Sequence, residues 1–150
     1  MKITIRQLDG AEAEIVLTYG EMTSEVEKII GFLKGRSMTL VGKCEDETVR
    51  FNVNEILYIE SVDDKTFAYT SGKVIKLGYS LSALGDLLDD IRFLRCSKSM
   101  IVNIDRIEWL KSLPSNRIDA TMSGGEHIII SRTYASELRN RLRKGGTGDE

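Results

Sequence analysis

The stretch FLRCSKSMIVNIDRIEW, residues 93–109, has apolar, strand-like sequence on both sides of a short polar group. The flanks predict two strands of a buried frame, and Ser97, Lys98 and Ser99 predict the loop between them. Loops held on a rigid frame often carry binding groups. With Arg95 and Lys98 as its cations, this loop would suit an anionic partner. The same residues are also consistent with an ordinary solvated connection.

The composition predicts one soluble domain with a substantial core. The chain has 150 residues, of which 41% are hydrophobic and 29% are charged, and no second full domain is needed to account for this length. No run approaches the roughly 18 apolar residues of a membrane span, and the charged start MKITIRQLDG lacks the apolar core of a signal peptide. We therefore expect a cytoplasmic protein.

Charge is unevenly distributed along the chain. Residues 37–91 carry 5 basic and 10 acidic groups, whereas residues 92–150 carry 11 basic and 7 acidic groups. A face that binds a polyanion should therefore come mainly from the C-terminal portion. The pI of 5.6 argues against indiscriminate coating of nucleic acid. Cys44 and Cys96 show no metal-binding or disulfide spacing, so we expect small buried apolar residues.

The N-terminal residues predict a β-β-α unit. Residues 2–7 and 13–18 alternate apolar and polar side chains around an Asp-Gly turn signal, as two strands would. A helix should follow, because Ser24 and Glu27 have capping-box spacing and Gly35 supplies a stop. The apolar stripe of this helix would consist of Met22, Val26, Ile29, Ile30 and Leu33.

From Met38 onward the pattern predicts a mainly β (α+β) fold. The short connections favour antiparallel meanders. The strands expected outside the central stretch are residues 39–43, 48–53, 56–62, 66–69, 73–77, 106–110, 117–122 and 127–130. A helix is expected at residues 80–88, before the central stretch, and another at residues 133–144, after the last strand.

Three blocks in this order resemble the LytTR family of bacterial DNA-binding domains. They are EILYIES at residues 55–61, FLRCSKSMIVNIDRI at residues 93–107, and IISRTY at residues 129–134, within a region of about residues 38–143. The resemblance implies an elongated antiparallel β fold of about ten short strands in stacked sheets. It also implies transcription control from paired direct repeats, with two protein copies, bent DNA, and loops in successive major grooves. No cofactor is implied.

The residues before this region resemble the N-terminal extension of stand-alone LytTR regulators. About 36 residues are too few for a phospho-acceptor receiver domain, which needs on the order of 100. The expected organisation is an extension at residues 1–36, a LytTR domain at residues 38–144, and a disordered tail at residues 145–150. In such regulators a co-encoded membrane protein often restrains the regulator, and the extension is the expected docking surface.

The resemblance places DNA contacts at three positions. One is the loop around Lys65 and Thr66, where two neighbouring acidic residues would weaken a phosphate contact. The second is the loop that contains Lys98, and the third is Arg132. Arginine presents a planar fork that fits the O6/N7 edge of guanine, whereas lysine is a point charge that suits a base edge or a phosphate. Backbone phosphate contacts are expected from Arg95, Ser97, Ser99 and Asn103.

Several of these residues have structural alternatives. Asn103 would more simply tie down its own loop by a backbone hydrogen bond. Arg95 would equally well pair with a carboxylate, and Arg132 would cap a strand end. Trp109 and Tyr58 alternate with polar neighbours, so we expect core residues and not stacking platforms for bases.

Other classes of function fit the sequence less well. The only histidine, His127, adjoins a strand, and no nucleophile elbow or phosphate-binding glycine loop is present, so we expect no enzyme. Aromatic residues interleaved with basic ones, as on RNA-binding strands, are not found. The main alternative is a protein-interaction module that does not bind DNA; the basic C-terminal portion argues against it.

Overall fold

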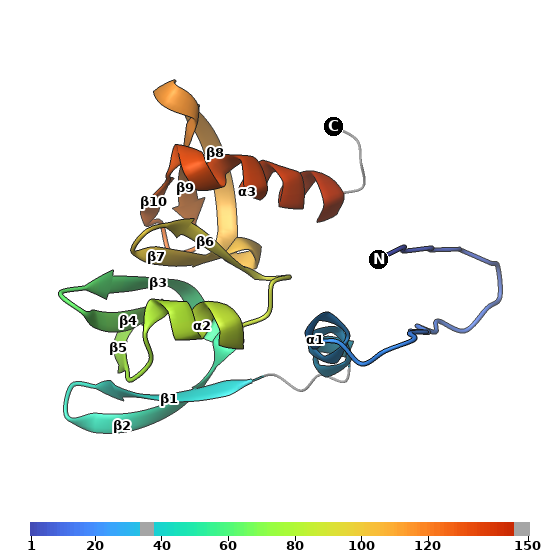
Figure 1. The fold of residues 1–150 in the computed structure, drawn as a ribbon, viewed down its shortest axis with the longest axis horizontal. Helices are drawn as coiled ribbons and strands as arrows, with labels where there is room; N and C mark the ends of the chain where they lie inside the picture. The colour runs from blue at the N-terminus through green and yellow to red at the C-terminus, as the bar shows by residue number, and fades with distance from the viewer. Residues whose placement is uncertain (34–37, 146–150) are drawn as a thin grey trace.

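The computed structural model describes residues 1–33 and 38–145 (Figure 1). Its strands are β1 (Thr39–Cys44), β2 (Glu47–Asn52), β3 (Ile56–Val62), β4 (Lys65–Thr70), β5 (Lys73–Leu77), β6 (Phe93–Ser97), β7 (Met100–Asn103), β8 (Ile107–Leu113), β9 (Arg117–Met122) and β10 (His127–Ile130). Its helices are α1 (Ser24–Leu33), α2 (Leu81–Leu87) and α3 (Arg132–Gly145). The expected mainly β fold is confirmed, and β3, β5, β9 and β10 have the predicted bounds.

The strands form two antiparallel sheets. One has seven strands in the order β2-β1-β5-β4-β3-β7-β6, and the other has three in the order β10-β9-β8. Most strands pair with a neighbour in sequence because two-residue turns return the chain directly alongside itself. The exceptions are the pairing of β1 with β5 and the pairing of β3 with β7, in which Ile59 lies opposite Ile101. This pairing attaches the β6–β7 hairpin to the side of the first meander.

The β6–β7 hairpin separates two hydrophobic cores. Phe93 and Ile101 pack with α2 and the meander in one core. Leu94 and Val102 face the other core, with β9, β10 and α3. Adjacent apolar residues in these strands are therefore buried on opposite sheet faces, which explains the continuous apolar run that flanks the central loop. The loop is consequently mounted on a strand pair that is anchored from both sides.

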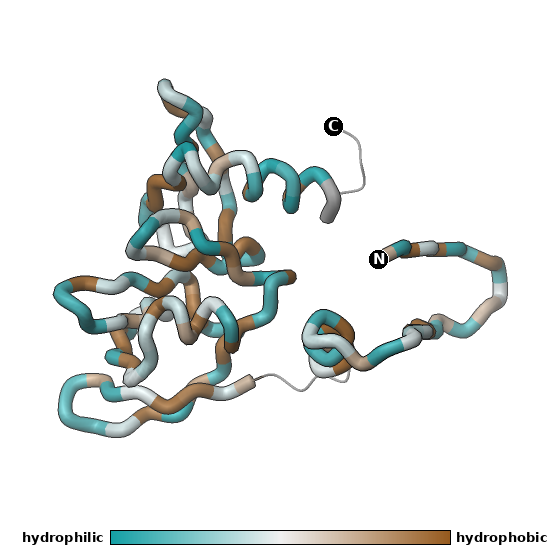
Figure 2. Tube along the Cα trace, in the orientation of Figure 1, coloured by the Kyte–Doolittle hydropathy of each residue, from teal (hydrophilic) through white to brown (hydrophobic). Residues whose placement is uncertain are grey.

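The two strands expected before α1 are not formed. Residues 2–7 and 13–18 have no regular structure, although a turn is present where Ala11 N donates to Leu8 O at 3.2 Å. Figure 2 shows apolar positions spread along this extended segment. An isolated two-stranded hairpin is marginally stable in water, and no third strand from the described chain lies beside it. The prediction of two strands was therefore wrong, because no pairing partner for this segment lies in the described chain.

The helix that follows is capped one residue before the predicted position. Thr23 Oγ1 accepts a hydrogen bond from Val26 N at 3.2 Å, so Thr23 and not Ser24 caps α1. Val26 is buried, whereas Met22 and Leu33 at the ends of the predicted stripe are exposed. The predicted stop at Gly35 lies outside the described residues, as do residues 146–150 of the expected tail.

Candidate nucleic-acid interface

Three turns lie along one edge of the fold, and we call them the ridge. They are the β3–β4 turn at Asp63 and Asp64, the β6–β7 turn at Lys98 and Ser99, and the β10–α3 junction at residues 131–132. Figure 1 shows all three at the left edge. Ser61 N donates to Ser99 O at 2.8 Å, which joins the first turn to the second. Ser131 N donates to Cys96 O at 3.0 Å and joins the third.

Arg95 organises the central turn from below. Its Nε donates to Ser97 O at 2.8 Å, and its Nη2 donates to Lys98 O. Ser99 N donates to Ser97 Oγ at 3.2 Å. The guanidinium is therefore used inside the turn, so neither the expected phosphate contact nor the alternative carboxylate pair describes its main role. The side chain of Lys98 projects from a turn whose backbone is already fixed, which reduces the entropy lost on binding.

Two predicted contact residues are buried. Thr66 is 3% exposed and Asn103 is 1% exposed, so neither side chain is accessible at the surface of this structure. Asn103 Nδ2 donates to Ile56 O at 2.8 Å, and its Oδ1 accepts from Asp105 N at 3.1 Å. The structural alternative for Asn103 is therefore correct. Strand residues alternate between the two faces of a sheet, so Thr66 lies on the buried face of β4, with Ala68. Its neighbour Lys65 is exposed.

Arg132 is the first residue of α3, and its side chain is exposed. No described residue hydrogen-bonds or forms an ion pair with its guanidinium, so the alternative role as a strand cap is not seen. Ser131 O accepts from Tyr134 N and Ala135 N, which starts the helix. Helix starts favour anions through free amide groups and the helix dipole. The exposed Thr133 hydroxyl also lies here, in the first turn of the helix that follows Ser131.

The β3–β4 turn offers a mixed charge. Lys65 is exposed, but Asp63 and Asp64 occupy the tip with φ values of 51° and 62°. Short acidic side chains tolerate this left-handed backbone region, so the geometry of a two-residue turn accounts for them. Their charges oppose phosphate binding, and Lys65 is the cationic group that this turn brings to the ridge.

The two aromatic residues expected in the core behave differently. Trp109 is 72% exposed on β8, an edge strand of the small sheet, so its prediction was wrong. Tyr58 is half-buried and stacks on Tyr69 with ring centroids 4.4 Å apart. Burial, with the neighbouring Tyr69 hydroxyl, raises the pKa of Tyr58. This pair stabilises the β3–β4 hairpin below the ridge.

Potentially reactive groups lie away from the ridge or are inert. Cys96 is buried, and burial raises its pKa to about 12, which keeps the thiol protonated. His127 is exposed, and its Nδ1 lies 2.9 Å from Asp119 Oδ1. Among the described residues, no group of three or more histidine, cysteine or acidic side chains is arranged to hold a metal ion.

The comparisons with known proteins identify the family. The family model described as the LytTr DNA-binding domain matches residues 46–143, which is most of the chain. The chain belongs to the LytTR family. Members of this family are DNA-binding domains and not enzymes, so the β scaffold and the ridge of this LytTR chain belong to a DNA-binding protein. A solved LytTr DNA-binding domain from Bacillus cereus superposes with a TM-score of 0.66 at 28% identity, covering 69% of this chain and 95% of the other.

Two kinds of curated relatives match this LytTR chain. An uncharacterized HTH-type transcriptional regulator of Staphylococcus aureus strain NCTC 8325 is 30% identical over 133 residues, covering 87% of this chain and 90% of the relative. The sensory transduction protein LytT of Bacillus cereus is 30% identical over 99 residues, which cover 66% of this chain and 40% of LytT. The chain thus spans less than half of LytT. Within the described ranges, no helix has both the length and the apolar character needed to span a membrane.

Proposed function

We propose that this chain is a sequence-specific transcriptional regulator that uses its ridge to recognise paired direct repeats in promoter DNA. One observation carries the proposal: Lys98 and Arg132 are both exposed on the same edge, and neither side chain is paired with a described residue. Two unneutralised cations on a rigid edge suit contact with the negative charges of a DNA backbone. Arg132 would read guanine, and Lys98 would contact a phosphate or a base edge.

The sheet geometry supports contact along one face of the duplex. The β3–β4 and β6–β7 hairpins are two strand spacings apart, about 10 Å, and the β10–α3 junction lies beyond β6. The outer turns of such a ridge can enter the two major grooves that flank one minor groove, which is about 6 Å wide. We therefore propose that loops of the ridge enter successive major grooves.

Selection of bound fragments from the genomic DNA of the source organism tests the proposal. We expect the recovered fragments to share a repeated motif whose two copies lie one or two helical turns apart on the same strand. Gel-shift titration should then show specific binding in the presence of excess competitor DNA. Recovery of fragments without a shared motif would favour the alternative, a protein-interaction module that does not bind DNA.

The role of Lys98 can be assigned from salt dependence. If Lys98 contacts a phosphate, Lys98→Ala should reduce the slope of log affinity against log salt by about one unit, because one fewer counterion is released. An unchanged slope with altered base preference would assign Lys98 to a base edge. Lys73→Ala is a matched control, because Lys73 is an exposed lysine at the start of β5, away from the ridge turns.

We further propose a cytoplasmic protein that binds DNA as two copies and bends it. A co-encoded membrane protein would restrain it through residues 1–36. Co-purification with membranes from the source organism should therefore fall when these residues are removed. Equal recovery of the full-length and shortened chains would contradict this docking role.

A further inference from the structure

Residues 1–22, which we call the N-terminal arm, expose an unusual amount of apolar side chain. Ile3 is 78% exposed, Ile5 is 90% exposed, Ile15 is 76% exposed and Val16 is 74% exposed. No hydrogen bond or ion pair joins the arm to another described part of the chain. Exposed apolar residues gathered in one segment indicate a surface that another molecule covers.

The arm is also divided into two halves of opposite charge. Lys2 and Arg6 lie in the first strand-like half, and Glu12 and Glu14 lie at the start of the second. All four side chains are exposed, and none forms an ion pair with a described residue. The first half of one arm therefore complements the second half of another, both in charge and in strand-forming alternation.

We propose that the arm binds the arm of a second copy of this chain, so that two arms form an antiparallel sheet of four strands. One arm alone supplies only two strands, which are marginally stable in water, whereas three or more strands sharing an apolar face are stable. The proposal rests on the proposed function, because it supplies the contact between the two copies on paired repeats.

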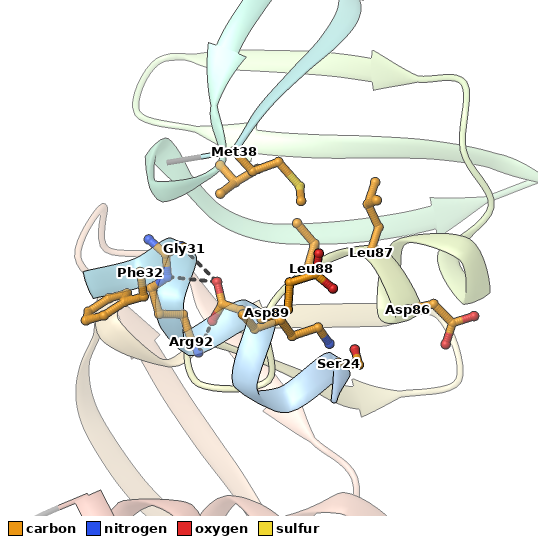
Figure 3. Close-up of a pocket in the computed structure, with 12 residues that line it drawn as sticks. Ser24, Gly31, Phe32, Met38, Asp86, Leu87, Leu88, Asp89 and Arg92 are labelled. Carbon is orange, nitrogen blue, oxygen red and sulfur yellow. Dashed lines mark hydrogen bonds and ion pairs between the residues drawn. The ribbon is translucent and has the colours of Figure 1, made fainter. Parts of the chain in front are cut away.

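The arm leaves the domain on the side opposite the ridge. Figure 1 shows α1 and the arm at the right and the ridge turns at the left. Helix α1 is held to the domain by Lys28 Nζ, which lies 3.6 Å from Asp90 Oδ1, and by the Arg92 guanidinium, 5.6 Å from the centre of the Phe32 ring. Figure 3 shows Phe32 beside Arg92, whose guanidinium donates a hydrogen bond to the Asp89 carboxylate. The arms would therefore be accessible while the ridge contacts DNA.

An extended arm also resolves a conflict of symmetry. Two copies on direct repeats are related by translation, whereas two identical arms that pair with each other form a two-fold contact. A segment without regular structure between the domain and the contact removes this conflict. Residues 19–22 lie between the strand-like halves and the start of α1, and fully extended they reach about 13 Å from each copy.

Charge exchange in the chain of residues 1–150 tests the proposal. One variant combines Lys2→Glu and Arg6→Glu, and the other combines Glu12→Lys and Glu14→Lys. Sedimentation equilibrium without DNA should show self-association of the unmodified chain, and at least a tenfold weaker association of each variant alone. A mixture of the two variants should associate like the unmodified chain. The chain with all four substitutions has the original net charge, and it should also associate as strongly as the unmodified chain.

Gel shifts separate this inference from the proposed function. On fragments with two repeats, we expect each variant to lose cooperativity by about 100-fold, the gain typical of linked binding. On fragments with one repeat, both variants should bind as tightly as the four-substitution chain, because the ridge is intact. An unmodified chain that stays monomeric and binds two repeats independently overturns the arm contact. Absence of single-repeat binding by chains that still associate overturns the proposed function instead.

Discussion

Replacement of Arg132 by alanine should reduce specific DNA affinity by about 5- to 150-fold, which corresponds to the 1–3 kcal/mol of a bidentate arginine–guanine contact. Arg132 is exposed at the start of α3 without a partner among the described residues. Removing it therefore breaks no contact that supports the fold. The measurement is a gel-shift titration against a selected fragment, with circular dichroism to show that the variant remains folded.

Two variants make this result specific. Arg143→Ala removes an exposed arginine near the other end of the same helix and should change affinity by less than twofold. Arg132→Lys keeps the charge but loses the planar fork, so it should preserve non-specific binding and lose discrimination at one base position. Equal effects of Arg132→Ala and Arg143→Ala would show that only overall charge matters, and would contradict base reading by Arg132.

Replacement of Asn103 by alanine should act on stability and not on recognition. The buried Asn103 amide donates to Ile56 O and its oxygen accepts from Asp105 N. Its loss leaves these two backbone groups without their partner at a cost of about 1–3 kcal/mol. For a chain of this size, the melting temperature should fall by about 3–9 °C. Thermal unfolding followed by circular dichroism measures the change.

The control for this variant is Ser99→Ala, which alters an exposed side chain at the tip of the same hairpin and should leave the melting temperature within about 1 °C. Below the unfolding range, Asn103→Ala should bind DNA with nearly unchanged affinity. A variant of unchanged stability that has lost DNA binding would return Asn103 to the set of contact residues.

Local sequence was sufficient for most of the scaffold. Strand β3 was predicted to the residue, because apolar alternation and turn signals act over a few neighbouring positions. The loop at Lys98 was also predicted, since its flanking strands are too apolar to lie in solvent. Thr66 was predicted as a DNA contact from the resemblance to a family. The structure shows that it is buried, because its side chain leaves the strand on the core side.

Context outside each segment decided the remaining features. Trp109 has the alternation of a half-buried strand, but β8 is the edge of the small sheet, and the described residues leave 72% of Trp109 exposed. Residues 2–7 and 13–18 have the composition of strands and no partner in the described chain. Pairing in a sheet is a contact between segments, so the sequence of one segment does not reveal whether the second is present.

The amino-acid sequence determined the strand-rich class, the order of the elements and the cationic side chains available for DNA. The tertiary structure alone placed Lys98 and Arg132 on one edge and turned Arg95 and Asn103 inward. The physical reason is that strand register and packing on two cores fix the direction of every side chain, through contacts between residues that are far apart in the chain.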